Sequence, residues 1–229
     1  TDCTVPTGAS QGNTHAARSS FYHLNRIAEH ARSWLPTVPW LTQQLTDNVN
    51  IDATCNAVWS GSAVNFYKSG GGCNNTGEIA GVFLHEWGHG LDENDGGGYD
   101  NPSEAYADIT ALISTHVSCV GRGFFQSGNC SGYGDACLNC TGIRDQDWNQ
   151  HASHTPATPQ GFATSNCGSG DGPCGKEPHC EAYVAAEPLY DLAVRDLTAS
   201  GLDLPSAWQL ADKLWYKSRQ GSGGNAYNC

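Results

Sequence analysis

The stretch that most constrains this chain is Val82-Phe83-Leu84-His85-Glu86-Trp87-Gly88-His89-Gly90, because it places two imidazoles and a carboxylate on one short apolar helix. Residues four apart lie on one face of a helix, so His85 and His89 can both aim a ring nitrogen at one metal ion while Glu86 flanks it. A catalytic zinc ion usually takes three protein ligands and keeps a fourth position for water. We therefore expect a zinc site with one further His, Asp or Glu ligand.

One candidate for the third ligand is Asp95, the eleventh residue counted from His85. Metzincin peptidases carry a His or Asp there, together with a glycine at the eighth position and a methionine turn beneath the metal. In this chain Asp92 stands at the eighth position and there is no methionine. A metzincin-like site with Asp95 as third ligand is thus an alternative, although the sequence lacks the glycine and the methionine of the metzincin pattern.

The other candidate is Glu104, in the segment Asn101-Pro102-Ser103-Glu104-Ala105-Tyr106-Ala107-Asp108-Ile109. Its proline and its apolar residues predict a second helix, on which Glu104 and Asp108 share a face. That spacing suits a ligand carboxylate followed by a carboxylate that accepts the other ring N–H of a zinc histidine. Glu104 also stands where a capping-box glutamate would reach back to Asn101, so both interpretations stay open.

At these residues the sequence resembles the gluzincin metallopeptidases, thermolysin and especially the fungalysins, in which HExxH is followed by an E-A-x-x-D-like helix. Further segments extend the resemblance. Phe21-Tyr22-His23-Leu24-Asn25 looks like the FYxxN helix of fungalysins, and Asn56-Ala57-Val58-Trp59 looks like the edge strand of thermolysins. Gly142-Ile143-Arg144 is similar to a GIR segment of fungalysins, and His179 opens a helix as the active-site histidine of both families does.

The resemblance implies an α+β, two-lobed, thermolysin-like fold in a single catalytic domain, residues 1–229. The upper lobe, about 1–115, should hold a small β-sheet and the HExxH helix, and the lower lobe, about 116–229, should be mainly helical. One catalytic Zn²⁺ is implied, with His85, His89 and Glu104 as ligands and Asp108 behind them. The implied activity is that of a zinc endopeptidase, and the alternative is a catalytically inactive binding module that kept the fold.

Site roles also follow from the resemblance. Glu86 should be the general base, while His179 and Tyr99 should donate hydrogen bonds to the developing oxyanion. Asn56 and Ala57 should bind an extended peptide along the edge strand, although an ordinary edge strand is the alternative. Arg144 should hold a substrate carbonyl, and a surface ion pair with Asp145 or Asp147 is its alternative.

Eleven cysteines beside a hydrophobic fraction of 38% predict that disulfides support the core, which indicates an oxidising compartment. We therefore expect a secreted or extracellular protein and, if so, a processed mature chain from which any pro-segment has been removed. The pair Cys137-x-x-Cys140 is also typical of a zinc knuckle or a redox pair, but no partner motif accompanies it.

The formal net charge of -12 argues against binding to nucleic acid or to anionic membranes, and no apolar run is long enough to span a bilayer. The expected partner is a peptide or protein substrate, and we expect a monomer. The acidic, glycine-rich segment 92–100 leaves Ca²⁺ as a possibility without support, because its spacing is not that of an EF-hand.

Periodicity predicts four further features. An amphipathic helix is expected at about residues 15–35, strands between 49 and 67 with a hairpin at Ser60-Gly61-Ser62, and closing helices at about 180–197 and 205–218. Disulfide-pinned loops are expected at 121–142, and a disulfide between Cys55 and Cys73 would staple the strand region.

Overall fold

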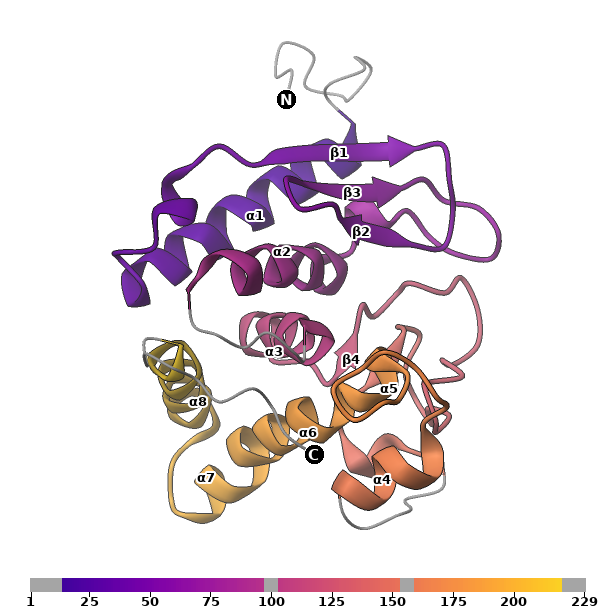
Figure 1. Cartoon of the computed structure of the whole chain (residues 1–229), viewed down its shortest axis with the longest axis vertical. Helices are drawn as coiled ribbons and strands as arrows, with labels where there is room; N and C mark the ends of the chain where they lie inside the picture. The colour runs from indigo at the N-terminus through magenta and orange to yellow at the C-terminus, as the bar shows by residue number, and fades with distance from the viewer. Residues whose placement is uncertain (1–13, 97–102, 153–158, 220–229) are drawn as a thin grey trace.

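The computed structural model describes residues 14–96, 103–152 and 159–219, and they form a mixed helix and sheet structure. Figure 1 shows the three-stranded sheet with α1 and α2 at one end, α3 in the middle, and α4 to α8 at the other end. The main core runs through all of these layers, from Leu24 of α1 to Trp208 of α8. The proposed division near residues 115 and 116 stays a prediction.

The elements begin and end as follows: α1 His15–Trp34, η1 Pro39–Thr42, β1 Thr46–Ile51, β2 Ala57–Trp59, β3 Ala63–Tyr67, η2 Thr76–Glu78, α2 Ala80–Asn94, α3 Ser103–Thr115, β4 Cys119–Val120, β5 Arg144–Asp145, η3 Trp148–Gln150, α4 Pro159–Asn166, α5 Pro178–Glu181, α6 Tyr183–Asp191, the π-helical η4 Leu192–Asp196, α7 Leu197–Ala199 and α8 Leu204–Ser218. The helix expected at about 15–35 is confirmed. The closing helix expected at about 180–197 is divided between short α and π segments.

The sheet has the strand order β1-β3-β2, so β2 is an edge strand. β2 and β3 are antiparallel and joined by the predicted hairpin, whereas β1 pairs with β3 in parallel. Apolar side chains of β3, among them Val64 and Phe66, are fully buried against the helices. One of the two edge strands, β2, thereby lies beside α2.

Helices α2 and α3 approach each other through a glycine. A Cβ added to Gly88 would lie 2.7 Å from Cα of Ala107, which is closer than a real contact allows. The missing side chain lets the two backbones touch. This contact lies between the helix faces that carry the two histidines and the two carboxylates, so it sets their separation.

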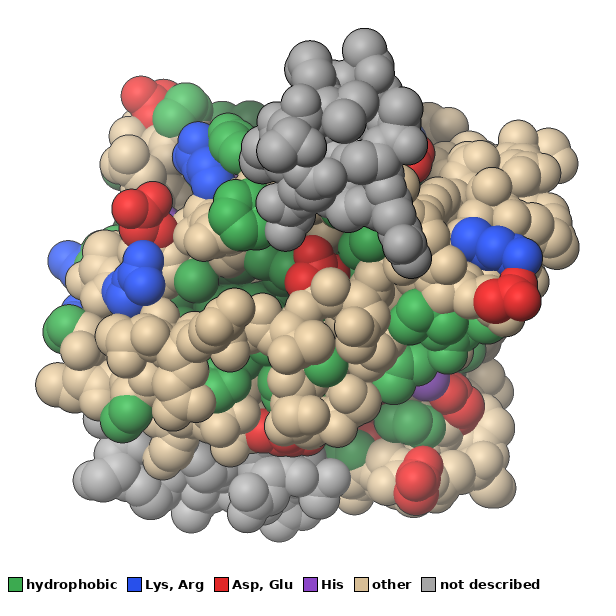
Figure 2. All heavy atoms as spheres, turned by 90° about the horizontal axis from the view of Figure 1, so that it is seen from above, with side chains coloured by type: hydrophobic (Ala, Val, Ile, Leu, Met, Phe, Trp, Pro, Cys, Tyr) green, Lys and Arg blue, Asp and Glu red, His purple; other side chains and the backbone are tan. Residues whose placement is uncertain are grey.

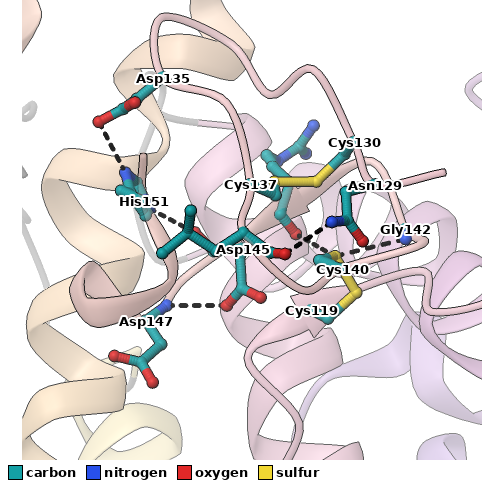
Figure 3. Close-up of a disulfide and its surroundings, with 12 residues drawn as sticks. Cys119, Asn129, Cys130, Asp135, Cys137, Cys140, Gly142, Asp145, Asp147 and His151 are labelled. Carbon is teal, nitrogen blue, oxygen red and sulfur yellow. Dashed lines mark hydrogen bonds and ion pairs between the residues drawn. A yellow bond between two sulfur atoms is a disulfide. The ribbon is translucent and has the colours of Figure 1, made fainter. Parts of the chain in front are cut away.

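The cysteine-rich segment after α3 is pinned by two disulfides, Cys119–Cys140 and Cys130–Cys137 (Figure 3). Each cysteine of the Cys137-x-x-Cys140 pair therefore belongs to a different disulfide, and neither thiol is available as a metal ligand. Cys55–Cys73 links the strand region as expected, and Cys167–Cys180 links α4 to α5.

On the face seen in Figure 2, Lys and Arg side chains are interspersed with Asp and Glu rather than gathered into one patch. Among the residues that the structure describes, no helix combines the length and the apolar character that a bilayer crossing requires.

Candidate metal centre

Side chains from α2 and α3 converge beside a cleft of about 500 Å³. Nε2 of His85 lies 3.2 Å from Nε2 of His89, and oxygens of Glu104 lie 3.3 Å from the first and 3.5 Å from the second. A tetrahedral zinc ion at about 2.0–2.1 Å from each ligand separates its ligand atoms by roughly 3.3 Å. These three side chains therefore have the spacing of three corners of a zinc tetrahedron, and they fit the ion.

The opposite ring nitrogen of His85 is held from behind. Nδ1 of His85 lies 2.9 Å from Oδ1 of Asp108, a fully buried carboxylate. Asp108 in turn accepts hydrogen bonds from Nη2 of Arg144 and Nε2 of Gln146, each at 2.7 Å. A carboxylate behind a histidine fixes its tautomer and ring orientation, so Nε2 of His85 faces the cleft.

The charges in this centre are strongly coupled. Burial alone would lower the pKa of His85, but hydrogen bonds to Asp108 and Glu104 outweigh it and raise this pKa to about 10. Burial and the neighbouring charge on His85 lower the pKa of His89 to about 4. Burial would raise the pKa of Glu104, yet the contacts with His85 hold it well below the usual value. A metal cation bound here would replace the proton on His85, so acid should weaken metal binding.

Glu86 lies beside this centre with its carboxylate fixed. Its Oε2 accepts a hydrogen bond of 2.7 Å from the backbone N–H of Trp59 at the end of β2. Burial raises the pKa of Glu86, and the charge on His85 opposes that shift. A carboxylate with a raised pKa is better matched to accepting a proton near neutral pH.

Arg144 and His179 come from distant parts of the chain to the same cleft. Arg144 is fully buried, and its guanidinium pairs with Asp108 and lies 3.1 Å from Glu104. The alternative of a surface ion pair with its sequence neighbours is therefore wrong. Nε2 of His179 lies 3.3 Å from Oε1 of Glu104. This imidazole therefore faces the group formed by His85, His89 and Glu104, which we call the donor cluster.

The remaining predicted residues are placed as follows. Asn56 and Ala57 line the cleft at the edge strand. Tyr99 lies outside the described residues. Glu104 directs its carboxylate to the two histidines and Arg144, while Asn101, its capping-box partner, also lies outside the described residues.

Asp95, the alternative third ligand, is not brought to the histidines. Its carboxylate lies 2.7 Å from Nε of Arg219 and accepts a hydrogen bond from the hydroxyl of Tyr106. Arg219 also lies 3.7 Å from Asp92. The metzincin-like expectation is therefore not supported, because a buried arginine from the end of α8 holds this aspartate. Asp92 and Asp95 of the acidic segment both face that same arginine, which adds nothing in favour of Ca²⁺.

Sequence reasoning missed two residues of the centre. Gln146 follows Arg144 by two positions and completes the hydrogen bonds of Asp108, and Tyr133 stacks on His179 with ring centroids 4.8 Å apart. Neither residue lies in a periodic segment or a motif, so only their cysteine-rich surroundings distinguish them in the sequence.

No family model matches this chain, and no curated protein matches it either. Among solved structures, it is similar to the precursor of protealysin, a metalloproteinase from Serratia proteamaculans, with a TM-score of 0.62 and 17% sequence identity. The match covers 94% of this chain and 69% of that chain. At this identity the likeness shows the fold alone. The chain therefore shares its fold with that metalloproteinase precursor.

Proposed function

We propose that this protein is a zinc-dependent endopeptidase with His85, His89 and Glu104 as the metal ligands. One observation carries the proposal: ligand atoms of three side chains, His85, His89 and Glu104, approach one another to 3.2–3.5 Å in a cleft that the buried Glu86 also lines. The metallopeptidase fold supports it independently.

Each nearby side chain has a part in the proposed reaction. Glu86 takes a proton from the attacking water and passes it to the leaving amine, with its carboxylate held by the N–H of Trp59. His179 donates a hydrogen bond to the oxyanion that develops on the carbonyl. A zinc ion in this site would supply Lewis acidity and a lowered pKa for water. Arg144 orients Asp108 and Glu104 and holds a substrate carbonyl on the leaving-group side.

The substrate is proposed to be an extended peptide. β2 is the edge of its sheet and lines the cleft together with the donor cluster. An extended chain can add to such an edge and satisfy backbone groups that β3 leaves unpaired. Asn56 and Ala57 would make these contacts.

We further propose a secreted or extracellular monomer that acts on peptides or proteins and binds neither nucleic acid nor membrane. Four disulfides among the described residues support an oxidising compartment.

The proposal is tested with Glu86→Gln. We expect this variant to bind zinc stoichiometrically while cleavage of a mixed peptide library falls by about 10²- to 10⁴-fold, because a general base contributes about that much. Parent cleavage should stop when a zinc chelator is added and return with zinc. Equal turnover by parent and variant would contradict the proposal, and a parent with no chelator-sensitive cleavage would favour a binding module.

A further inference from the structure

Tyr133 lies in a loop that the Cys130–Cys137 disulfide closes. Its neighbours Gly132 and Gly134 both have positive φ angles, of 61° and 86°. A Cβ on Gly132 would lie 1.9 Å from the carbonyl oxygen of Asp135, so no other residue fits there. The conformation that projects the Tyr133 side chain is therefore built into the sequence of this loop.

The loop also packs directly against the start of α5. A Cβ on Gly134 would lie 2.7 Å from Sγ of Cys180, the residue after His179. Nδ2 of Asn166 donates a hydrogen bond of 3.1 Å to the carbonyl of Gly134. Because Cys180 is itself bonded to Cys167 at the end of α4, the loop and the backbone beside His179 are fixed to each other.

The consequence is an aromatic stack in the cleft. The rings of Tyr133 and His179 have centroids 4.8 Å apart and planes 14° from parallel. The guanidinium carbon of Arg144 lies 5.6 Å from the centroid of the Tyr133 ring. All three side chains line the cleft that holds the donor cluster.

His179 needs such support because its side chain is 36% exposed. Its Nδ1 contacts Oε1 of Glu177, and its Nε2 lies 3.3 Å from Oε1 of Glu104. Both contacts are made by ring nitrogens, while the second torsion of a histidine side chain is broad. The stacked Tyr133 ring restricts rotation of the His179 imidazole about this torsion, which the two contacts alone do not fix.

We propose that Tyr133 is a positioning residue whose ring holds the imidazole of His179 in the cleft, with Nε2 facing Glu104. The kinetic part of this inference rests on the proposed peptidase function, whereas the stack itself does not. The aromatic ring, and not the hydroxyl, positions His179. Phenylalanine at position 133 should therefore keep this function, and leucine should lose it.

The stack is tested first by NMR of ¹³C-labelled histidine rings, with the His179 signals assigned by their loss in His179→Ala. We expect nuclear Overhauser contacts between the rings of His179 and Tyr133 in the unmodified protein. Ring-current shielding should persist in Tyr133→Phe and disappear in Tyr133→Leu. Leu138→Ala, an exposed apolar change just beyond the loop, is the control and should leave the His179 signals in place.

The positioning role is tested next by steady-state kinetics with zinc content measured in every variant. Tyr133→Leu should lower kcat by about three- to tenfold with KM little changed, in keeping with the energy of one aromatic pair. Tyr133→Phe should remain close to the parent. In the His179→Ala background, which lowers kcat by about 10²- to 10³-fold, Tyr133→Leu should have no further effect.

Absence of the ring contacts in the unmodified protein would overturn the proposal whether or not the Tyr133 variants fold. It would also be overturned if Tyr133→Leu lowered kcat equally with and without His179, because Tyr133 would then act elsewhere. A parent that cleaves no peptide would refute the proposed function, while the ring signals would still decide the stack.

Discussion

His85 and His151 are both buried beside carboxylates, yet their surroundings differ. His85 has Asp108 behind one ring nitrogen, while the other faces His89 and Glu104 in the cleft. His151 has Nε2 at 2.8 Å from Glu187 and 2.7 Å from the carbonyl oxygen of its neighbour Asp145. Its other nitrogen, Nδ1, lies 3.7 Å from Asp135 (Figure 3).

The two clusters show that a histidine beside carboxylates is not by itself a metal site. Aromatic rings of Trp148, Phe162 and Tyr183 pack around His151, and acceptors of Asp145 and Glu187 lie within 2.8 Å of its Nε2. Among the described residues, the group with histidine ligands spaced for a metal ion is His85, His89 and Glu104. This group differs from the His151 cluster because it has a second imidazole and because it opens into the cleft.

The largest expected effect comes from removing the ligand carboxylate. Loss of a residue that only hydrogen-bonds to a metal ligand weakens metal binding by roughly 10- to 100-fold. Glu104→Gln should weaken zinc binding by more than this, because it removes one of the three ligands. Asp95→Asn is the matched control and should keep zinc near the parental level, since that carboxylate faces Arg219. Zinc affinity is measured by competition with a chelator on folded protein. Zinc lost from the Asp95 variant and kept by the Glu104 variant would restore the metzincin-like alternative.

The next effect concerns the carboxylate behind the ligand. Asp108→Asn should weaken zinc binding by about 10- to 100-fold, because the amide no longer fixes His85 as the carboxylate does. Asp135→Asn makes the same change beside His151 and should leave zinc affinity unaltered. Equal effects of the two variants in the same chelator competition would mean that the clusters do not differ as described.

The smallest effect is on stability and its pH dependence. Burial would lower the pKa of His151, but the hydrogen bond and charge of Glu187 outweigh it, so the pKa is raised. The imidazolium therefore stabilises the fold fully below the unfolded pKa of about 6.5, and this contribution is lost as pH rises through the folded pKa. His151→Gln should lower the free energy of unfolding by about 1.5–3 kcal/mol at pH 5.5, and the difference from the parent should shrink at higher pH.

This pH dependence is measured by denaturant unfolding between pH 5.5 and 9. His30→Gln is the control, because His30 also contacts a carboxylate, Asp212, but its side chain is 46% exposed and such pairs contribute little. A difference between His151→Gln and the parent that grows with pH would show that His151 is neutral in the folded protein.

The sequence alone was sufficient for the features that depend on helix periodicity. His85, Glu86 and His89 lie within little more than one turn of α2, and Glu104 and Asp108 share a face of α3. Their relative positions follow from a repeat of 3.6 residues, whatever the rest of the chain does. α1 was predictable for the same reason, and the strand hairpin was predictable from strand patterning and its Ser-Gly-Ser turn.

Only the tertiary structure decided which distant groups meet these helices. Arg144 and Gln146 reach Asp108 from β5, and Tyr133 reaches His179 from a disulfide-closed loop. Asp95 pairs with Arg219, more than a hundred positions further along the chain. Loops without periodicity are placed by packing, glycine conformation and cysteine pairing, and these depend on contacts between segments that no local pattern in the sequence records.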